Sequence, residues 1–264
     1  MRIALGLEYD GRDFTGWQTQ PAGTGIQDAL EAALSRIAGT PVATVCAGRT
    51  DSGVHATQQV VHFDVDVQRP ESAWVRGVNT YLPDSVAVRW ATVVPEDFHA
   101  RFSATGRAYR YLLLNRPQRP GLARGRAGWF HHPLDEAAMV EAAARIMGTH
   151  DFSAFRAAEC QANSPVRTVT RAEVRRFGDW IVFDFAANAF LHHMIRNLVG
   201  SLVYIGKGAH PPAWMDELLA ARNRTLAAPT FAPDGLYLAG VDYPAGFALP
   251  AAPVEGEAFP WIAP

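Results

Sequence analysis

Strict alternation of apolar and polar residues predicts β-strands at several points along the chain. Between Arg2 and Glu8 every second residue is apolar, and Gln59–Val67 repeats this pattern with His62 on its polar side. Two apolar stretches flank Gly178-Asp179, a pair of residues typical of a hairpin turn. Strands are therefore expected over Val42–Cys46, Val86–Val94, Tyr109–Leu113, Val166–Phe177, Trp180–Phe185 and Leu236–Tyr243.

Apolar residues recur with a helical period in four other segments. In the first, Thr24 and Gln27 are expected to form a capping box, and Gly39 ends the helix. Asn188 is expected to begin a long helix that continues to Ile205. The polar side of that helix carries His192, His193, Arg196 and Gly200, and further helices are expected from Asp135 to Gly148 and after Pro212. This order of strands and helices, with hairpins, indicates an α+β fold with mostly antiparallel sheet.

Composition describes a soluble globular protein. The chain has 264 residues, of which 48% are hydrophobic and 19% charged, enough material for a sizeable core. No signal sequence and no apolar run long enough to span a bilayer is apparent, and the two cysteines form neither a disulfide framework nor a zinc quartet. A cytoplasmic location is expected.

Charge is distributed unevenly. The net charge is only -2, yet no acid occurs between Asp97 and Asp135. This stretch contains the arginines Arg101, Arg107, Arg110, Arg116, Arg119, Arg124 and Arg126. A basic surface on an otherwise acidic body favours binding to a nucleic-acid backbone, with chance clustering of solvated arginines as the alternative.

The most distinctive short segment is A-G-R-T-D-S-G-V-H, from Ala47 to His55. Its glycines allow tight turns and close approach of a substrate, and Arg49 can bind phosphate or keep Asp51 ionised. A carboxylate there suits nucleophilic attack on a glycosidic carbon or an electron-poor ring. An ordinary loop with Asp51 in an Asx turn is an equally good interpretation of the spacing alone.

Two other segments are candidates for binding or catalysis. Arg196 is a suitable counter-ion for a catalytic acid, although a solvated helix face is the more common role for such a residue. The segment F-H-A-R-F (Phe98–Phe102) interleaves aromatic and basic residues, a pattern that suits binding to looped RNA. The alternative is that its phenylalanines belong to the core. Adjacent histidines lack the helical spacing of metal ligands, so zinc is disfavoured. The absence of phosphate-loop and dinucleotide motifs disfavours ATP and NAD.

Five motifs together closely resemble the tRNA pseudouridine synthase A family. They are A-G-R-T-D-S-G-V-H-A, E-Y-D-G-R-D-F-T-G-W-Q, F-H-A-R-F-S-A-T, R-A-Y-R-Y and N-A-F-L-H-H-M-I-R-N-L-V-G-S-L, in segments spread over nearly the whole chain. The resemblance implies isomerisation of uridine to pseudouridine at positions 38, 39 and 40 of the tRNA anticodon stem-loop, by a homodimer that uses no cofactor. It also implies two similar α/β halves, 1–105 and 106–245, whose antiparallel sheets join into one central sheet with helices outside, followed by a proline-rich tail, 246–264.

The resemblance also assigns roles to individual residues. Asp51 is similar to the catalytic nucleophile, Tyr109 to the tyrosine that stacks on the target uracil, and Arg196 to the arginine that pairs with the aspartate. The expected RNA contacts are Tyr109, Arg49, Arg69, Phe98, His99, Ala100, Arg101, Phe102, Glu159, Cys160, Gln161, Ala162 and Asn163. Asn163 departs from the family, where a basic residue is usual.

The expected mechanism leaves two choices open. Asp51 attacks either C1′ of the ribose or C6 of a flipped-out uracil, and Tyr109, water or Asp51 itself removes the C5 proton. A catalytically silent RNA-binding module with the same arginines is the alternative function. A phosphate-directed hydrolase would need a metal site, for which the sequence shows no acid cluster.

Overall fold

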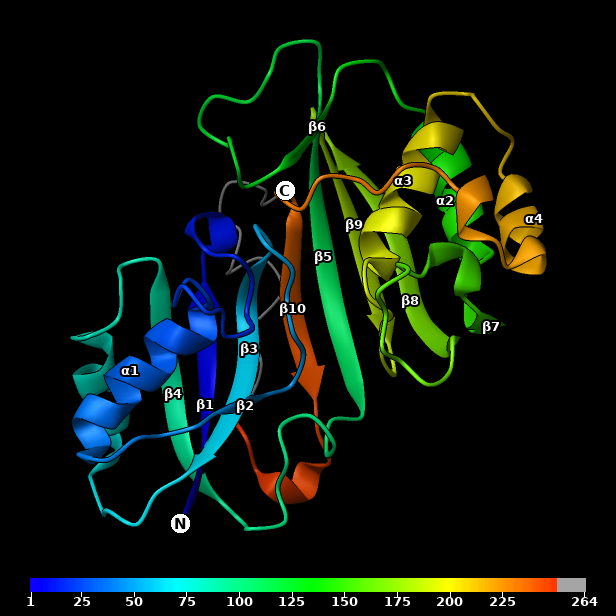
Figure 1. Cartoon of the computed structure of the whole chain (residues 1–264). Helices are drawn as coiled ribbons and strands as arrows, with labels where there is room; N and C mark the ends of the chain where they lie inside the picture. The colour runs from blue at the N-terminus through cyan, green and yellow to red at the C-terminus, as the bar shows by residue number, and fades with distance from the viewer. Residues whose placement is uncertain (251–264) are drawn as a thin grey trace. The chain divides into compact units, whose positions relative to one another are not determined.

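The computed structural model describes residues 1–250 (Figure 1). The chain forms two compact units. The first unit contains Met1–Thr105 and the described residues from Tyr237 onward, and the second contains Gly106–Leu236. The first unit gives way to the second after Thr105, and the strand from Leu236 lies mainly in the first unit. The two expected halves, 1–105 and 106–245, stay a prediction. Residues 251–264 of the expected tail lie outside the described residues.

The first unit is built on a mixed sheet in the order β4-β1-β3-β10, with β2 also paired to β3. The strands are β1 (Arg2–Tyr9), β2 (Val45–Cys46), β3 (His55–Asp64), β4 (Val86–Val94) and β10 (Leu236–Asp242). β1 runs antiparallel to β3 and β4, whereas β10 runs parallel to β3 with Tyr237 opposite His55. Both faces of β3 are buried, so its predicted polar side is covered as well: His62 is only 4% exposed, and the rings of Phe98 and His99 lie against it.

One helix, α1 (Ile26–Ala38), belongs to the first unit. Its N-cap is Gly25 rather than Thr24, because the Asp28 carboxylate accepts the Gly25 N–H at 2.9 Å while the Thr24 hydroxyl pairs with Thr15. The capping position expected from the sequence was therefore wrong by one residue. Its end at Gly39 is confirmed, since this residue has a φ of 75°.

The second unit contains an antiparallel sheet in the order β5-β9-β8-β7, with β6 parallel to β5. The strands are β5 (Gly106–Asn115), β6 (Gly128–Phe130), β7 (Gly148–Asp151), β8 (Val166–Phe177) and β9 (Trp180–Ala187). The hairpin predicted between β8 and β9 is confirmed, and Gly178 has the positive φ, 58°, that this turn requires.

Helices cover the apolar side of this second sheet. They are α2 (Glu136–Ala144), α3 (Met194–Gly206) and α4 (Trp214–Ala221), and α2 packs on both β8 and α3 (Figure 1). Asp135 caps α2 as predicted, because its carboxylate accepts the Ala138 N–H at 3.1 Å. The fold class expected from the sequence, α+β with mostly antiparallel strands and helices outside, is confirmed in both units.

Helix α3 begins five residues later than expected, because its N-cap is His193. Asn188 does not cap it; its Oδ1 instead accepts the N–H groups of Thr168 and Ala189 beyond the end of β9. His193 then adopts a left-handed conformation, φ 60°, which cannot continue into a regular helix on its N-terminal side. The expectation that His192 and His193 share a helical face with Arg196 was therefore wrong.

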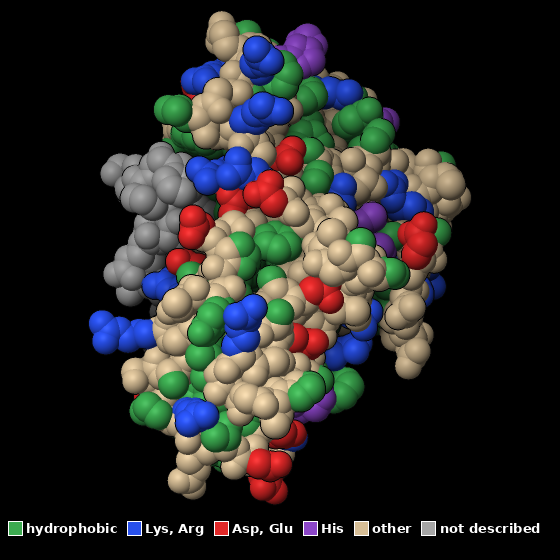
Figure 2. Space-filling view, turned by 60° about the vertical axis from the view of Figure 1, so that its left-hand side comes forward, with side chains coloured by type: hydrophobic (Ala, Val, Ile, Leu, Met, Phe, Trp, Pro, Cys, Tyr) green, Lys and Arg blue, Asp and Glu red, His purple; other side chains and the backbone are tan. Residues whose placement is uncertain are grey.

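A buried carboxylate binds two arginines inside the second sheet. Asp184 on β9 is 2% exposed, and its oxygens accept from Arg110 on β5 at 2.7 Å and from Arg175 on β8 at 2.6 Å. Arg110 is 12% exposed, so it contributes little to the surface charge expected from the acid-free stretch. The face drawn in Figure 2 carries basic and acidic side chains interspersed.

The remaining regular structure consists of short helical turns. These are Gly11–Asp13, Ala73–Gly77, Ser153–Phe155, Arg224–Leu226 and Ala245–Phe247. No helix within residues 1–250 is both long and apolar enough to cross a membrane.

Candidate functional site

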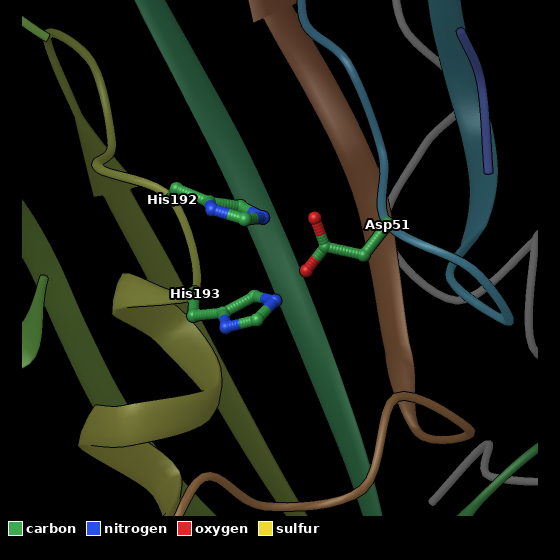
Figure 3. Close-up of side chains that lie close together, drawn as sticks. All are labelled: Asp51, His192 and His193. Carbon is green, nitrogen blue, oxygen red and sulfur yellow. The ribbon is translucent and has the colours of Figure 1, made fainter. Parts of the chain in front are cut away.

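The loop that carries Asp51 is held by hydrogen bonds on both sides of that residue. The Trp17 N–H donates to Thr50 O at 2.9 Å, and the buried hydroxyls of Thr50 and Tyr9 pair at 2.8 Å. On the other side, Val54 N–H donates to Asp51 O at 3.1 Å. The main chain is therefore fixed around a half-buried carboxylate, whose side chain extends from the loop in Figure 3.

Close packing of main chain against main chain explains the glycines around this loop. Gly16 has a φ of 95°, and a Cβ there would lie 2.8 Å from Thr50 O and 3.1 Å from the Asp51 carbonyl carbon. Gly53 has a φ of 78°, which turns the chain sharply after Asp51. These two glycines let the segment after β1 and the Asp51 loop approach one another closely.

A histidine beside an aspartate supports the far end of the loop. His55 is 2% exposed, its Nδ1 lies 3.3 Å from an Asp10 carboxylate oxygen, and its ring stacks on Tyr237 with centroids 4.6 Å apart. Burial alone would raise the pKa of Asp10, but hydrogen bonds with His55 and Arg12 outweigh burial and hold that pKa well below its usual range. Asp10 therefore stays ionised and fixes the residue that follows the loop.

Two of the three predicted arginines of the first unit, Arg49 and Arg69, have different surroundings. Arg49 is exposed, and none of the described residues forms a hydrogen bond or ion pair with its side chain. Arg69 is exposed as well, but its Nε donates to Ile37 O at 3.4 Å, near the end of α1. Arg69 thus satisfies a carbonyl in the last turn of this helix, a role that the sequence did not indicate.

The F-H-A-R-F segment contains both core and surface residues. Phe98 and Ala100 are fully buried, so the alternative of a core phenylalanine applies to Phe98. Phe102 is 75% exposed, its ring lies 4.4 Å from that of His99, and Arg101 lies over it at 5.4 Å. Arg101 and Phe102 are exposed and His99 is half-buried, and together they form an aromatic and basic surface.

A buried histidine on β3 holds this segment in place. His62 Nδ1 accepts the Ala100 N–H at 3.1 Å. Burial, and then the positive charge of Arg2 and the neighbouring His99, lower the pKa of His62 to about 4. The neutral imidazole is therefore the form that binds the loop.

The predicted residues of the second unit are centred on β5 and α3. Tyr109 on β5 is half-buried, and its ring meets Phe190 edge to face with centroids 5.2 Å apart. The ring is thereby held at its edge. Phe190 was assigned to a helix by the sequence, but it precedes α3.

Arg196 lies in the first turn of α3 and is bound to the segment from Ala227 to Ala232. Its Nε donates to Phe231 O at 2.8 Å, and Phe231 N–H donates back to Arg196 O at 3.2 Å. This reciprocal pair fixes the plane of the guanidinium. Phe231 was not identified from the sequence, because no local pattern links it to a helix more than thirty residues earlier.

The polar loop Glu159–Asn163 is organised by an arginine that the sequence did not single out. Arg156 donates to Cys160 O at 2.6 Å and to Ala162 O at 3.0 Å. Burial raises the pKa of Cys160, but hydrogen bonds from Ala162 and His192 N–H and the Arg156 charge outweigh it and lower that pKa. Glu159, Gln161 and Asn163 are exposed.

Neither unit by itself brings together a set of metal ligands among its described residues. Figure 3 draws His192 and His193, which extend from the segment immediately before α3. Within either unit taken alone, the described part of the chain contains no group of three His, Cys, Asp or Glu ligand atoms close enough to share an ion.

Comparison with known proteins gives a consistent result. The model of the tRNA pseudouridine synthase family matches residues 7–103 and 142–244. A relative from Dechloromonas aromatica (strain RCB), named tRNA pseudouridine synthase A, is 66% identical over 95% of this chain and 95% of its own. One of the same name from Aromatoleum aromaticum (strain DSM 19018 / LMG 30748 / EbN1) is 62% identical over 95% of each chain.

A solved structure, titled Crystal Structure of a Cbf5-Nop10-Gar1 Complex, matches 76% of this chain and 45% of its own. Its sequence identity is 12% and its TM-score is 0.34, a similarity too low to support an argument.

Proposed function

The chain belongs to the tRNA pseudouridine synthase family, whose members are isomerases, and from this premise we propose its specific reaction. It converts uridine to pseudouridine at positions 38, 39 and 40 of the tRNA anticodon stem-loop, with Asp51 as the nucleophile. The homodimer implied by the sequence resemblance and the cytoplasmic location expected from the composition remain predictions.

The observation that supports Asp51 most directly is the bracing of its loop. Hydrogen bonds from Trp17 to Thr50 O and from Val54 to Asp51 O, with the close approach of Gly16, fix the backbone on both sides of one carboxylate. A nucleophile held in one position before substrate arrives loses less entropy at the transition state. A loop built only to connect two strands would need none of these contacts.

The reaction begins with the uridine out of the stack, at a cost on the order of a few kcal/mol that contacts in the pocket offset. In the proposal, Tyr109 stacks on the uracil, and Phe190 limits how far the tyrosine ring can tilt. Arg49, exposed beside the nucleophile, binds the phosphate backbone of the flipped nucleotide.

Bond making and breaking then follow in order. The Asp51 carboxylate attacks C1′ or C6, and the N1–C1′ bond breaks. The uracil turns while it is held, and C5 bonds to C1′. The bond between Asp51 and C1′ or C6 breaks, which regenerates the carboxylate, the C5 proton passes to Tyr109, water or Asp51, and N1 takes up a proton. Arg196, whose Nε is bound to Phe231 O, serves as the counter-ion of the Asp51 carboxylate.

The test uses an anticodon stem-loop tRNA transcript labelled with tritium at C5 of uridine. Tritium release is followed for the wild type, for Asp51→Asn, and for Asp66→Asn, which changes an exposed acid of the same unit. Filter binding of the same tRNA is measured in parallel. We expect release by the wild type and by Asp66→Asn, and none by an Asp51→Asn variant that still binds.

Two results would contradict the proposal in different ways. Binding without tritium release by the wild type would favour the silent RNA-binding module. Release by Asp51→Asn at the wild-type rate would leave the isomerase intact but remove Asp51 as its nucleophile. Mapping pseudouridine in the product would test the three expected positions separately.

A further inference from the structure

The segment from Ala227 to Ala232 runs against α3 at very short range. A Cβ on Gly200 would lie 2.4 Å from Pro229 O, so the main chain of this segment occupies the space that a side chain would fill. The segment ends at Ala232, whose carbonyl accepts the Tyr111 hydroxyl at 2.9 Å. Phe231, which binds Arg196, lies between these two anchor points.

A single arginine, Arg224, forms hydrogen bonds with the start of this segment. Arg224 donates to Ala228 O at 2.9 Å and to Ala227 O at 3.3 Å. Its other terminal nitrogen donates to Asn197 Oδ1 at 2.9 Å and to Thr230 Oγ1 at 3.0 Å. One planar guanidinium thus links the segment to α3 at the residue directly after Arg196.

Asn197 completes the network without leaving an unpaired polar group. It is fully buried, its Oδ1 also accepts the Thr230 hydroxyl at 2.7 Å, and its Nδ2 donates to Phe155 O at 2.8 Å. A buried polar network in which each member is satisfied is rigid and specifies one arrangement. The positions of Thr230 and of its neighbour Phe231 are therefore fixed relative to α3.

The charge of Arg224 has no obvious purpose in stability. Burial lowers its pKa, and no carboxylate in residues 1–250 pairs with it. A desolvated cation that binds only neutral oxygens is an expensive way to hold a loop. Its forked geometry, however, can reach four acceptors that no other side chain could bind together.

We propose that Arg224, acting with Asn197 and Thr230, is a positioning residue for Arg196. It clamps residues 227–230 against α3, so that Phe231 O meets the Arg196 Nε and holds the guanidinium in the orientation that the reaction needs. The inference rests on the proposed function, because it assumes that Arg196 serves the chemistry.

The experiment uses the full chain and single-turnover tritium release from C5-labelled tRNA. Arg224→Lys keeps the charge but loses the fork, and Thr230→Val keeps the volume but loses the hydroxyl. Arg176→Lys is the matched control, because Arg176 also donates to an asparagine Oδ1 and a main-chain carbonyl, at Asn115 and Leu134 in the same unit. Each variant is also made in an Arg196→Lys background, with thermal melting and tRNA binding measured throughout.

We expect Arg224→Lys and Thr230→Val to slow release roughly tenfold, since a displaced catalytic group typically costs that much or more. Binding of tRNA should change by less than about twofold, because the effect acts on orientation. In the Arg196→Lys background the same changes should slow release by less than about twofold, since coupled residues are not additive. Arg176→Lys should release tritium at nearly the wild-type rate.

Equal slowing in both backgrounds, or equal slowing by Arg176→Lys, would overturn the inference, because the effect would then be general destabilisation. If Arg224→Lys does not fold, Thr230→Val alone decides by the same comparison. Loss of tritium release in the wild type overturns the proposed function and this inference together, whereas normal wild-type release with additive variants overturns only the inference.

Discussion

Acidification from pH 7 to about pH 4 should lower the stability of the first unit, because His62 becomes protonated in this range. In the folded chain this ring is buried, and its Nδ1 accepts the Ala100 N–H, so protonation would break that bond and bury a charge near Arg2. The pKa is about 4 in the folded chain, against 6.5 for an unperturbed histidine. The neutral form is thus favoured by folding, and its stabilisation is complete above pH 6.5 and disappears as the pH falls toward 4.

The magnitude follows from the difference between these two pKa values. At pH 5 the unfolded chain is almost fully protonated at this residue while the folded chain is mostly neutral. At about 1.4 kcal/mol per pH unit, lowering the pH from 7 to 5 should reduce the free energy of unfolding by about 2 kcal/mol. The full loss, reached near pH 4, is about 3 kcal/mol.

Urea unfolding at pH 7 and pH 5, for the wild type and for His62→Asn, measures this contribution. Asparagine retains an acceptor near the position of Nδ1 but does not titrate, so the variant should lose about 2 kcal/mol less than the wild type between the two pH values. Exchange of the Ala100 amide should accelerate on acidification in the wild type only. Equal losses in the two proteins would refute the assignment of this pH range to His62.

Two further predictions concern packing and charge. Gly200→Ala places a Cβ 2.4 Å from a main-chain oxygen and should destabilise the protein by about 1–3 kcal/mol, although alanine normally favours a helix. Gly206→Ala should destabilise it less, because its Cβ meets the flexible Met139 side chain at 2.8 Å. Equal melting temperatures of the two variants would contradict this expectation. Asp10→Asn should lower the free energy of unfolding by about 1–3 kcal/mol at pH 7, and the difference from wild type should shrink below pH about 4, where a carboxyl of depressed pKa loses its contribution. A difference independent of pH would contradict the second expectation.

Local patterns were sufficient to predict most of the fold. The strands β1 and β4, the hairpin at Gly178 and the Asp135 cap depend on neighbouring residues, and each is confirmed. The start of α3 was mispredicted because the helical period extends back through Phe190. The helix begins later because Asn188 Oδ1 accepts the Thr168 N–H of the neighbouring strand and so does not cap the helix.

The sequence could indicate a candidate site residue where one short segment contains all the residues that the argument needs. The Asp51 loop and its glycines lie within nine residues, so spacing and chemistry could be considered together. The pairing of Arg196 with Phe231 and the burial of His62 depend on residues that are remote in sequence. Such contacts are set by how the elements pack, and a periodicity of two or 3.6 residues contains no information about them.

The buried Asp184 has a consequence for how RNA binding should respond to salt. Affinity for a polyanion falls with rising ionic strength in proportion to the number of counterions displaced from the phosphates. Arg110 is already compensated by a carboxylate inside the sheet, so it has no counterions to exchange with RNA. A count of arginines in the acid-free stretch therefore overstates how steeply the logarithm of the RNA association constant should fall with the logarithm of the salt concentration. By neutralising Arg110, Asp184 also limits the nonspecific affinity of the protein for RNA.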